Sequence, residues 1–213
     1  MTGTPFAKDA VASAGRGAVG RTGELLAVVR DRGYTRSATP FSLSSGGTSH
    51  DYVDLRRAVS RGDDLRVAAE VVAEVLSDAC VEYDAIGGMT MGADPVAHAV
   101  ALLTGRSWFS VRKAEKSHGS RRRVEGAELR PGTRVVVFED TTTTGRSLAE
   151  AVEVVAATGA TVALACTILD RGESAGALFA AMGVPYRAIL GFRDLGIDAV
   201  PGPGTAGTGR PAD

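Results

Sequence analysis

The feature that most constrains the fold is an alternation, from residue 84 to residue 190, of short apolar segments with segments of helical periodicity. The run Val135–Phe138 is wholly apolar and rich in β-branched residues, which is typical of a strand buried on both faces. Expected strands cover residues 84–89, 107–111, 134–139, 161–169 and 186–190, and expected helices cover residues 94–103, 147–157 and 174–182. This order predicts an α/β fold with a central parallel sheet flanked by helices and with ligands at the carboxyl ends of the strands.

The N-terminal part of the chain has a different pattern. Apolar residues at helical spacing predict helices over residues 20–32 and 63–80. Between them, a Gly-rich turn flanked by short alternating segments predicts a small hairpin with strands over 41–47 and 50–56. We therefore expect an N-terminal helix and hood hairpin over residues 1–60, a core domain over 61–200 and a disordered Pro/Gly/Thr-rich tail over 201–213, with 186–197 as a second part of the hood.

Composition restricts the classes of function. The net charge of −1 argues against a surface built to bind nucleic acid, and no segment has the pattern of a signal peptide or a membrane span. Cys80 and Cys166 each lie in an apolar run, which predicts two buried, reduced thiols. His50 and His98 have no second ligand at metal-binding spacing and are expected as surface and helix residues. These features predict a cytoplasmic protein.

The segment Val135–Ser147 carries the strongest chemical signal, because an apolar strand is followed by two adjacent acids, four threonines, a glycine and a helix. Unpaired amides at the start of a helix, together with threonine hydroxyls, suit a dianionic phosphate. Glu139 and Asp140 follow the strand and can accept hydrogen bonds from adjacent ribose hydroxyls. The alternative is a polar loop whose threonines satisfy nearby backbone groups. The order of the whole string favours a sugar-phosphate site.

Residues 112–128 are polar and charged and lack apolar periodicity, which predicts a long loop or mobile arm. Lysine is scarce in this chain, yet two of its three lysines, Lys113 and Lys116, lie in this segment. The alternative is a solvated basic loop. The clustering of lysines beside the end of a predicted parallel strand favours a functional role.

The segment 135–147 resembles the phosphoribosyl diphosphate motif of the type I phosphoribosyltransferases. The segments 41–46 with 52–56, 111–119 and 169–171 look like successive signatures of orotate phosphoribosyltransferases, so the resemblance covers residues 20–198. It implies Mg²⁺-dependent transfer of a 5-phosphoribosyl group from its diphosphate to N1 of orotate, which yields orotidine 5′-phosphate and pyrophosphate in pyrimidine nucleotide synthesis. It also implies a homodimer in which loop 112–126 completes the neighbouring active site.

The same resemblance implies roles for individual residues. Asp140, Lys116 and His118 would be catalytic, and Mg²⁺ would be held by pyrophosphate and water near Asp140, with no direct protein ligand. The residues expected to bind phosphoribosyl diphosphate are Arg112, Lys113, Lys116, His118, Glu139, Asp140, Thr141, Thr142, Thr143, Thr144, Gly145, Arg146 and Ser147. The residues expected to bind orotate are Ser44, Tyr52, Thr143 and Arg171. Alternatively, Arg171 is an ordinary surface arginine and Tyr52 a packing residue.

Two positions depart from the resemblance, because many relatives carry lysine at the position of Ser44 and near Gly92. Residues 87–95 are interpreted as a variant pyrophosphate loop of small residues, and the alternative is a plain turn capped by Asp94. These departures leave open a phosphoribosyltransferase for another base, such as a purine or a pyrimidine analogue. A non-catalytic regulator that binds phosphoribosyl diphosphate is a weaker alternative, because no helix-turn-helix segment is evident and both acids are retained.

Overall fold

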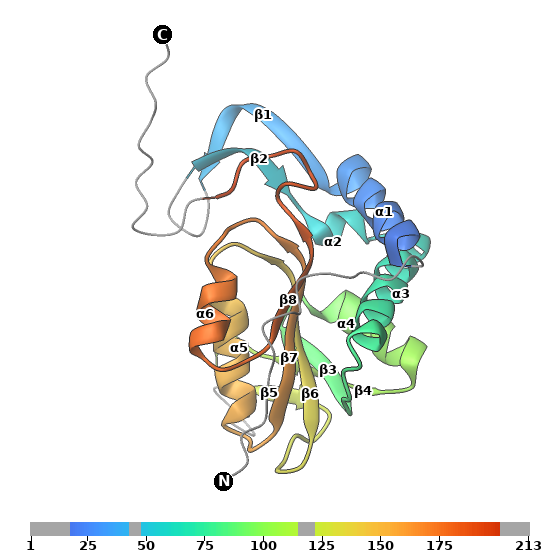
Figure 1. Ribbon diagram of the computed structural model, residues 1–213, viewed down its shortest axis with the longest axis vertical. Coiled ribbons are helices and arrows are strands. Elements are labelled where there is room, and N and C mark those ends of the chain that lie inside the picture. Colours follow the sequence, from blue (N-terminus) through green and yellow to red (C-terminus); the bar gives the residue numbers. More distant parts are fainter. Residues whose placement is uncertain (1–17, 43–47, 115–121, 201–213) are drawn as a thin grey trace.

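The computed structural model describes residues 18–42, 48–114 and 122–200. Its centre is a six-stranded sheet with the order β5-β4-β3-β6-β7-β8, in which every neighbouring pair is parallel except β4 with β5 (Figure 1). The strands are β3 (Ala85–Met89), β4 (Ser107–Val111), β5 (Val124–Gly126), β6 (Arg134–Thr142), β7 (Thr161–Asp170) and β8 (Tyr186–Gly191). The predicted α/β class with a central, mostly parallel sheet is confirmed.

Helices cover both faces of this sheet, as Figure 1 shows. Val136 and Phe138 of β6 pack into one core with the helices that precede β6 in the chain, and Val135 and Val137 pack into a second core with the two helices that follow it. This division follows from the pleat, because successive strand residues point to opposite faces. The first core contains α1 (Ala18–Val28), the π-helical turn η1 (Val29–Gly33), α3 (Gly62–Asp78) and α4 (Asp94–Thr104), and the second contains α5 (Arg146–Ala156) and α6 (Ala175–Ala181).

Strand β6 is longer than the sequence predicted. The apolar run suggested an end at Glu139, but the pairing of β6 with β7 continues as far as Thr142, which lies opposite Asp170. The backbone partner on β7 keeps the polar residues extended even though they contribute nothing apolar to the core. The adjacent acids, Glu139 and Asp140, are therefore held in strand geometry at the carboxyl end of a central strand.

Strand β5 was missed by the sequence reading, which assigned residues 112–128 to a loop. It is a short edge strand that pairs antiparallel with β4, with Val124 opposite Val111 and Gly126 opposite Phe109. Three residues are too few to show an alternating pattern, so nothing local distinguished this strand from its polar surroundings. The part of the predicted loop at residues 115–121 lies outside the described residues.

The predicted hairpin exists as a separate two-stranded sheet, β1 (Tyr34–Ser42) with β2 (Thr48–Val53). The predicted extension of the second strand to Arg56 is wrong, because the Asp54 carboxylate accepts a hydrogen bond from the Arg57 amide at 3.1 Å and caps the short helix α2 (Leu55–Ala58). Figure 1 shows this hairpin at one end of the central sheet, and α2 follows β2 next to the hairpin. The hairpin is called the hood below.

Two further predictions need correction. Residues 186–191, assigned in part to the hood, form β8 of the central sheet, and only the chain after β8 rises toward the hood in Figure 1. Cys166 is buried as expected, but Cys80 is exposed, because it follows the end of α3 and adopts a positive φ of 51°. Among the described residues, no helix is long and apolar enough to cross a membrane. The expected tail at 201–213 lies outside the described residues.

Candidate active site

The turn after β6 is built by its own hydroxyls and by one glycine. The amide of Gly145 donates to the Thr142 hydroxyl at 3.0 Å, which folds the chain back before α5 begins at Arg146. Gly145 has a φ of +80° and lies against Ala175 and Leu178, so a side chain there would be both strained and crowded. The four threonines consequently surround the N-terminal end of a helix, where backbone amides are unpaired.

Two adjoining hollows meet at the acidic pair. The larger, of about 510 Å³, is lined by the threonine turn and the start of α5, and the smaller, of about 350 Å³, lies between β6, the loop after β3, and the segment from β2 to α2. Both hollows are lined by Lys113, Glu139, Thr141 and Ser147. Asp140 lines only the smaller hollow, as expected for the strand neighbour of Glu139. The acids therefore stand at the junction of two polar spaces.

Glu139 is buried at this junction, with 8% of its surface exposed. Burial raises its pKa to about 7, and the neighbouring charge of Asp140 adds to this increase. The hydroxyls of Ser147 and Thr142 and the Lys113 ammonium act in the opposite direction. Its Oε2 atom has no hydrogen-bond partner among the described residues. Glu139 is thus an incompletely satisfied acceptor facing the space that both hollows share.

Asp140 is held more firmly. Its Oδ1 atom accepts a hydrogen bond from the Thr141 amide at 2.8 Å. Burial raises the pKa of Asp140, and this increase is opposed by the Thr141 hydrogen bond and by the positive charge of Arg56. Arg56 reaches the smaller hollow from α2, together with Asp54. Asp54 and Arg56, which follow the hood in the sequence, therefore place a carboxylate and a cation opposite Asp140.

The loop after β3 forms the remaining wall of the smaller hollow, through Thr90, Met91 and Gly92. The Asp94 carboxylate accepts hydrogen bonds from the hydroxyls of Thr90 at 2.6 Å and Ser110 at 2.7 Å. Asp94 is therefore not the N-cap of α4, which begins after Ala93 without a side-chain cap, so the alternative of an Asp94-capped turn is wrong. The interpretation of 87–95 as a pyrophosphate loop stays a prediction.

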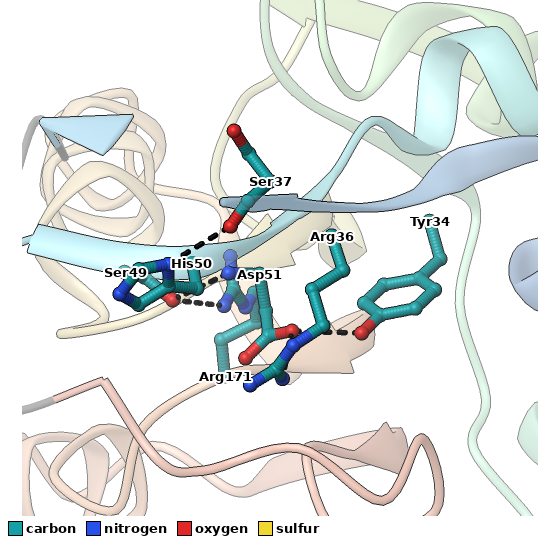
Figure 2. A network of polar contacts seen from close by, with 7 residues as sticks. All are labelled: Tyr34, Arg36, Ser37, Ser49, His50, Asp51 and Arg171. Atoms are coloured by element: carbon teal, nitrogen blue, oxygen red, sulfur yellow. Dashed lines mark hydrogen bonds and ion pairs between the residues drawn. The ribbon is translucent and has the colours of Figure 1, made fainter. Parts of the chain in front are cut away.

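Arg171 lies beneath the hood and is buried, with only 4% of its surface exposed, which excludes the reading of it as an ordinary surface arginine. Figure 2 shows its guanidinium beside Ser49 and Asp51 of β2; Arg171 Nη2 donates to the Ser49 hydroxyl at 3.5 Å. The Arg171 Nε atom is buried and has no hydrogen-bond partner in the part of the chain that the structure describes. Burial lowers the pKa of Arg171, and the nearby charge of Asp51 opposes that effect.

The Asp51 carboxylate is already shared between two other groups. It accepts hydrogen bonds from the Tyr34 hydroxyl at 2.7 Å and from Arg36 Nη1 at 2.9 Å (Figure 2). Among the described residues, no carboxylate forms an ion pair with Arg171. The buried guanidinium consequently keeps hydrogen-bonding capacity that these neighbours do not use.

The predicted site residues fall into three groups. Glu139, Asp140, the threonine turn, Arg146, Ser147 and Lys113 come together around the two hollows, and Tyr52 lines the smaller one with its ring 5.5 Å from that of Phe41. Arg112 lines neither hollow, and its Nη1 lies 3.9 Å from the Glu125 carboxylate. Ser44, Lys116 and His118 lie outside the described residues. The binding and catalytic roles of all these residues stay predictions.

Several lining residues were not assigned by the sequence reading. They are Asp54, Arg56 and Glu150. Arg56 belongs to the 52–56 signature and could have been assigned. That segment was predicted to be a strand, in which successive side chains point to opposite faces, so Arg56 was not placed in the site. The structure instead turns Arg56 into the hollow by starting α2 at Leu55. The described residues contain no group of three or more His, Cys, Asp or Glu that could hold a metal ion.

Comparison with solved structures identifies the class. An adenine phosphoribosyltransferase from Leishmania tarentolae shares the fold with a TM-score of 0.55 at 16% identity, over 70% of this chain and 80% of that one. A Mycobacterium tuberculosis orotate phosphoribosyltransferase in complex with 5-phospho-α-D-ribosyl 1-diphosphate matches with a TM-score of 0.69 at 37% identity, over 83% of this chain and 99% of that one. The fold is that of a type I phosphoribosyltransferase.

Sequence relatives narrow the class. No family model matches the chain. An orotate phosphoribosyltransferase from Streptomyces coelicolor is 47% identical over 182 residues, 83% of this chain and 97% of that protein. One from Corynebacterium glutamicum is 43% identical over 159 residues, 74% of this chain and 85% of that protein. The chain belongs to the orotate phosphoribosyltransferase family, and the family and enzyme class predicted from the sequence are confirmed.

Proposed function

We propose that the protein transfers the 5-phosphoribosyl group of phosphoribosyl diphosphate to orotate, forming orotidine 5′-phosphate and pyrophosphate in the synthesis of pyrimidine nucleotides. This is the reaction for which its relatives are named. The observation that carries the proposal in this chain is the acidic pair at the junction of two polar hollows, with the threonine turn on one side and the hood segment on the other. Two adjoining spaces suit a donor with a phosphate at one end and a diphosphate at the other.

The larger hollow is the proposed site of the 5′-phosphate. The unpaired amides at the start of α5 and the threonine hydroxyls are donors for its oxygens, and the helix dipole favours a negative charge there. The ribose hydroxyls would then reach Glu139 and Asp140 at the junction. A ribose hydroxyl would donate a hydrogen bond to Glu139 Oε2, which has no partner among the described residues.

Loss of pyrophosphate leaves positive charge on the sugar ring and concentrates negative charge on the leaving group. Asp140, fixed by the Thr141 amide, would stabilise the developing cation, while Lys113 and Arg56 line the hollow that would receive pyrophosphate. Carboxylate oxygens of Asp140 and Asp54 suit a hard ion such as Mg²⁺, which usually keeps several waters and binds through substrate phosphates. When bound, Mg²⁺ would neutralise charge on the diphosphate. Lys116 and His118 complete the proposed set of catalytic cations.

Arg171, which lies beneath the hood, is the proposed base-binding group and would pair with the orotate carboxylate. A buried guanidinium that lacks an ion-pair partner among the described residues is costly, and a carboxylate whose two oxygens accept its hydrogen bonds would satisfy it. A neutral base offers no such compensation. This argument favours orotate over uracil or a purine. Tyr52, Thr143 and Ser44 are proposed to border the base, and we propose residues 1–60 as the hood over a core at 61–200.

A homodimer is the proposed assembly, in which the part of loop 112–126 that carries Lys116 and His118 completes the site of the other subunit. Its support is an exposed apolar surface on α4 and β4. The rings of His98 and Trp108 lie 4.4 Å apart, and Leu102, which is 87% exposed, follows His98 by one helical turn. Leu103 next to it is also exposed. Large exposed apolar groups that gather in one place mark interaction surfaces.

Subunit complementation tests this assembly. A Lys116→Ala subunit and an Asp140→Asn subunit, refolded together, would form heterodimers with one intact site if Lys116 acts across the interface. Statistical mixing would then recover about a quarter of the wild-type activity. Recovery of no activity from the mixture, beside each inactive variant alone, would show that Lys116 serves its own subunit or that no dimer forms.

A base-panel assay tests the reaction itself. The protein is incubated with Mg²⁺, phosphoribosyl diphosphate and orotate, uracil, adenine or hypoxanthine, and pyrophosphate release is measured. We expect release with orotate and its loss when the metal is chelated. Release only with another base would favour the alternative substrate, and donor binding without release with any base would favour a regulator. We also propose a cytoplasmic location, which fits two free cysteines.

A further inference from the structure

Arg123 lies directly before β5, at the end of the segment that connects β4 to β5. Its Nε donates to the Arg112 carbonyl at 2.9 Å, and its Nη2 donates to the Lys113 carbonyl at 3.1 Å and to the Glu150 carboxylate at 2.6 Å. Its own carbonyl accepts from the Arg112 amide at 2.8 Å. One guanidinium thus connects the residues after β4 and the residue before β5 to helix α5, which begins at the phosphate turn.

This arrangement fixes the backbone of Lys113, which lines both hollows. Lys113 lies beyond the last residue of β4, and its amide and carbonyl take no part in the pairing of β4 with β5. Its carbonyl is instead held by Arg123. A planar guanidinium with several N–H donors suits this task because it can serve acceptors in different directions without changing its own geometry. The side chain of Arg123 is three-quarters buried, although its contacts with the Lys113 carbonyl and the Glu150 carboxylate lie at the surface.

We propose that Arg123 is a positioning residue, which together with Glu150 holds Lys113 over the junction of the two hollows. The inference rests on the proposed function, because it assigns Lys113 to the phosphoribosyl diphosphate site. Arg123 itself lines neither hollow. Arg123 contacts the Lys113 backbone and, through Glu150, helix α5. These contacts keep the Lys113 ammonium group in a fixed position relative to the phosphate turn.

A simpler role for Arg123 is to neutralise Glu150, which lines the larger hollow and would repel a bound phosphate. A double-mutant comparison separates the two roles. Arg123→Ala is expected to raise KM for phosphoribosyl diphosphate about tenfold, the effect of losing one charged hydrogen bond, with a smaller change in KM for orotate. If Arg123 positions Lys113, the double variant Arg123→Ala with Glu150→Gln keeps the raised KM. A KM restored to the wild-type value in the double variant would overturn the proposal.

Matched variants sharpen this comparison. Arg123→Lys keeps a positive charge opposite Glu150 but lacks the fork that serves both carbonyls, so its KM for the donor should also rise. Wild-type kinetics in Arg123→Lys would contradict the positioning role. The neighbouring Arg122, which is exposed, provides the control variant Arg122→Ala, for which we expect unchanged constants. Melting temperatures of all variants show whether a change in KM merely reflects loss of folded protein.

A measurement without substrate keeps the inference independent of the proposed reaction. The chain has three lysines, so reductive ¹³C-methylation gives three lysine signals in an NMR spectrum, and Lys113→Arg identifies that of Lys113. We expect this signal to shift in Arg123→Ala and to stay in place in Arg122→Ala. An unchanged Lys113 signal in Arg123→Ala would refute the positioning role whether or not the protein binds phosphoribosyl diphosphate. Failure of the wild-type protein to bind the donor would instead refute the proposed function.

Discussion

Glu139→Gln should stabilise the substrate-free protein, although it removes a group of the proposed active site. Burial raises the pKa of Glu139 to about 7, so the folded state holds a proton that the unfolded chain releases at lower pH. The free energy of unfolding therefore falls as the pH rises from the ordinary carboxyl value of 4.5 to about 7. Below this window the folded and unfolded states are both protonated and the side chain has no effect of this kind.

The size of the effect follows from the shift in pKa. Each unit of pKa corresponds to about 1.4 kcal/mol, so ionisation of Glu139 costs the folded state roughly 3 kcal/mol at pH 8 and less than about 1 kcal/mol at pH 5. Glutamine has a similar shape and does not ionise. The stability gained by Glu139→Gln over wild type should accordingly grow by about 2 kcal/mol between pH 5 and pH 8.

Urea unfolding of both proteins at a series of pH values measures this difference. Other groups titrate in the same range, but they are common to both proteins and cancel in the comparison. Glu153→Gln, on the exposed side of α5, is a matched control whose difference from wild type should stay constant with pH. If the difference for Glu139→Gln is the same at pH 5 and pH 8, Glu139 is already ionised in the folded state and the reasoning is wrong.

Three further variants test individual contacts by steady-state kinetics. Asp140→Asn should lower kcat about 10²–10³-fold with a smaller change in KM for phosphoribosyl diphosphate, and equal losses would mean that Asp140 only holds the ribose. Arg171→Ala should raise KM for orotate about 10–100-fold and leave the donor KM nearly unchanged; parallel increases would contradict a base-specific role. Arg56→Ala should move the acidic limb of the rate profile to higher pH, because Arg56 lowers the pKa of Asp140, and an unmoved limb would disprove this coupling.

Much of the central sheet could be predicted because its strands are buried on both faces. A strand such as Val135–Phe138 leaves a continuous apolar run, and the helices between strands leave a helical period. The predicted strand ends were less accurate, because polar residues such as Thr141 and Thr142 stay in β6 through pairing with β7. Such pairing depends on a segment distant in the sequence, and no local pattern reports it.

The candidate site divides in the same way. The phosphate side could be predicted because the acids, threonines, glycine and helix are contiguous, so that spacing alone brings them together. Two other lining residues were not predicted, because Arg56 reaches the smaller hollow from α2 and Glu150 reaches the larger hollow from the second turn of α5. Arg123 shows the limit most clearly: its three acceptors lie on two segments of the chain, and its neighbours in sequence are also arginines.

The structure explains why glycine lies at position 92, near which many relatives carry a lysine. A Cβ atom there would lie 2.6 Å from Asp140 Oδ1, the atom that accepts the Thr141 amide. A side chain at 92 would have to displace a buried carboxylate from its hydrogen bond, so with this placement of Asp140 the loop has no room for lysine. Arg56 enters the same hollow from the opposite wall. We therefore expect Arg56 to supply the cation that position 92 lacks, which would tie the charge of the proposed donor site to the placement of α2.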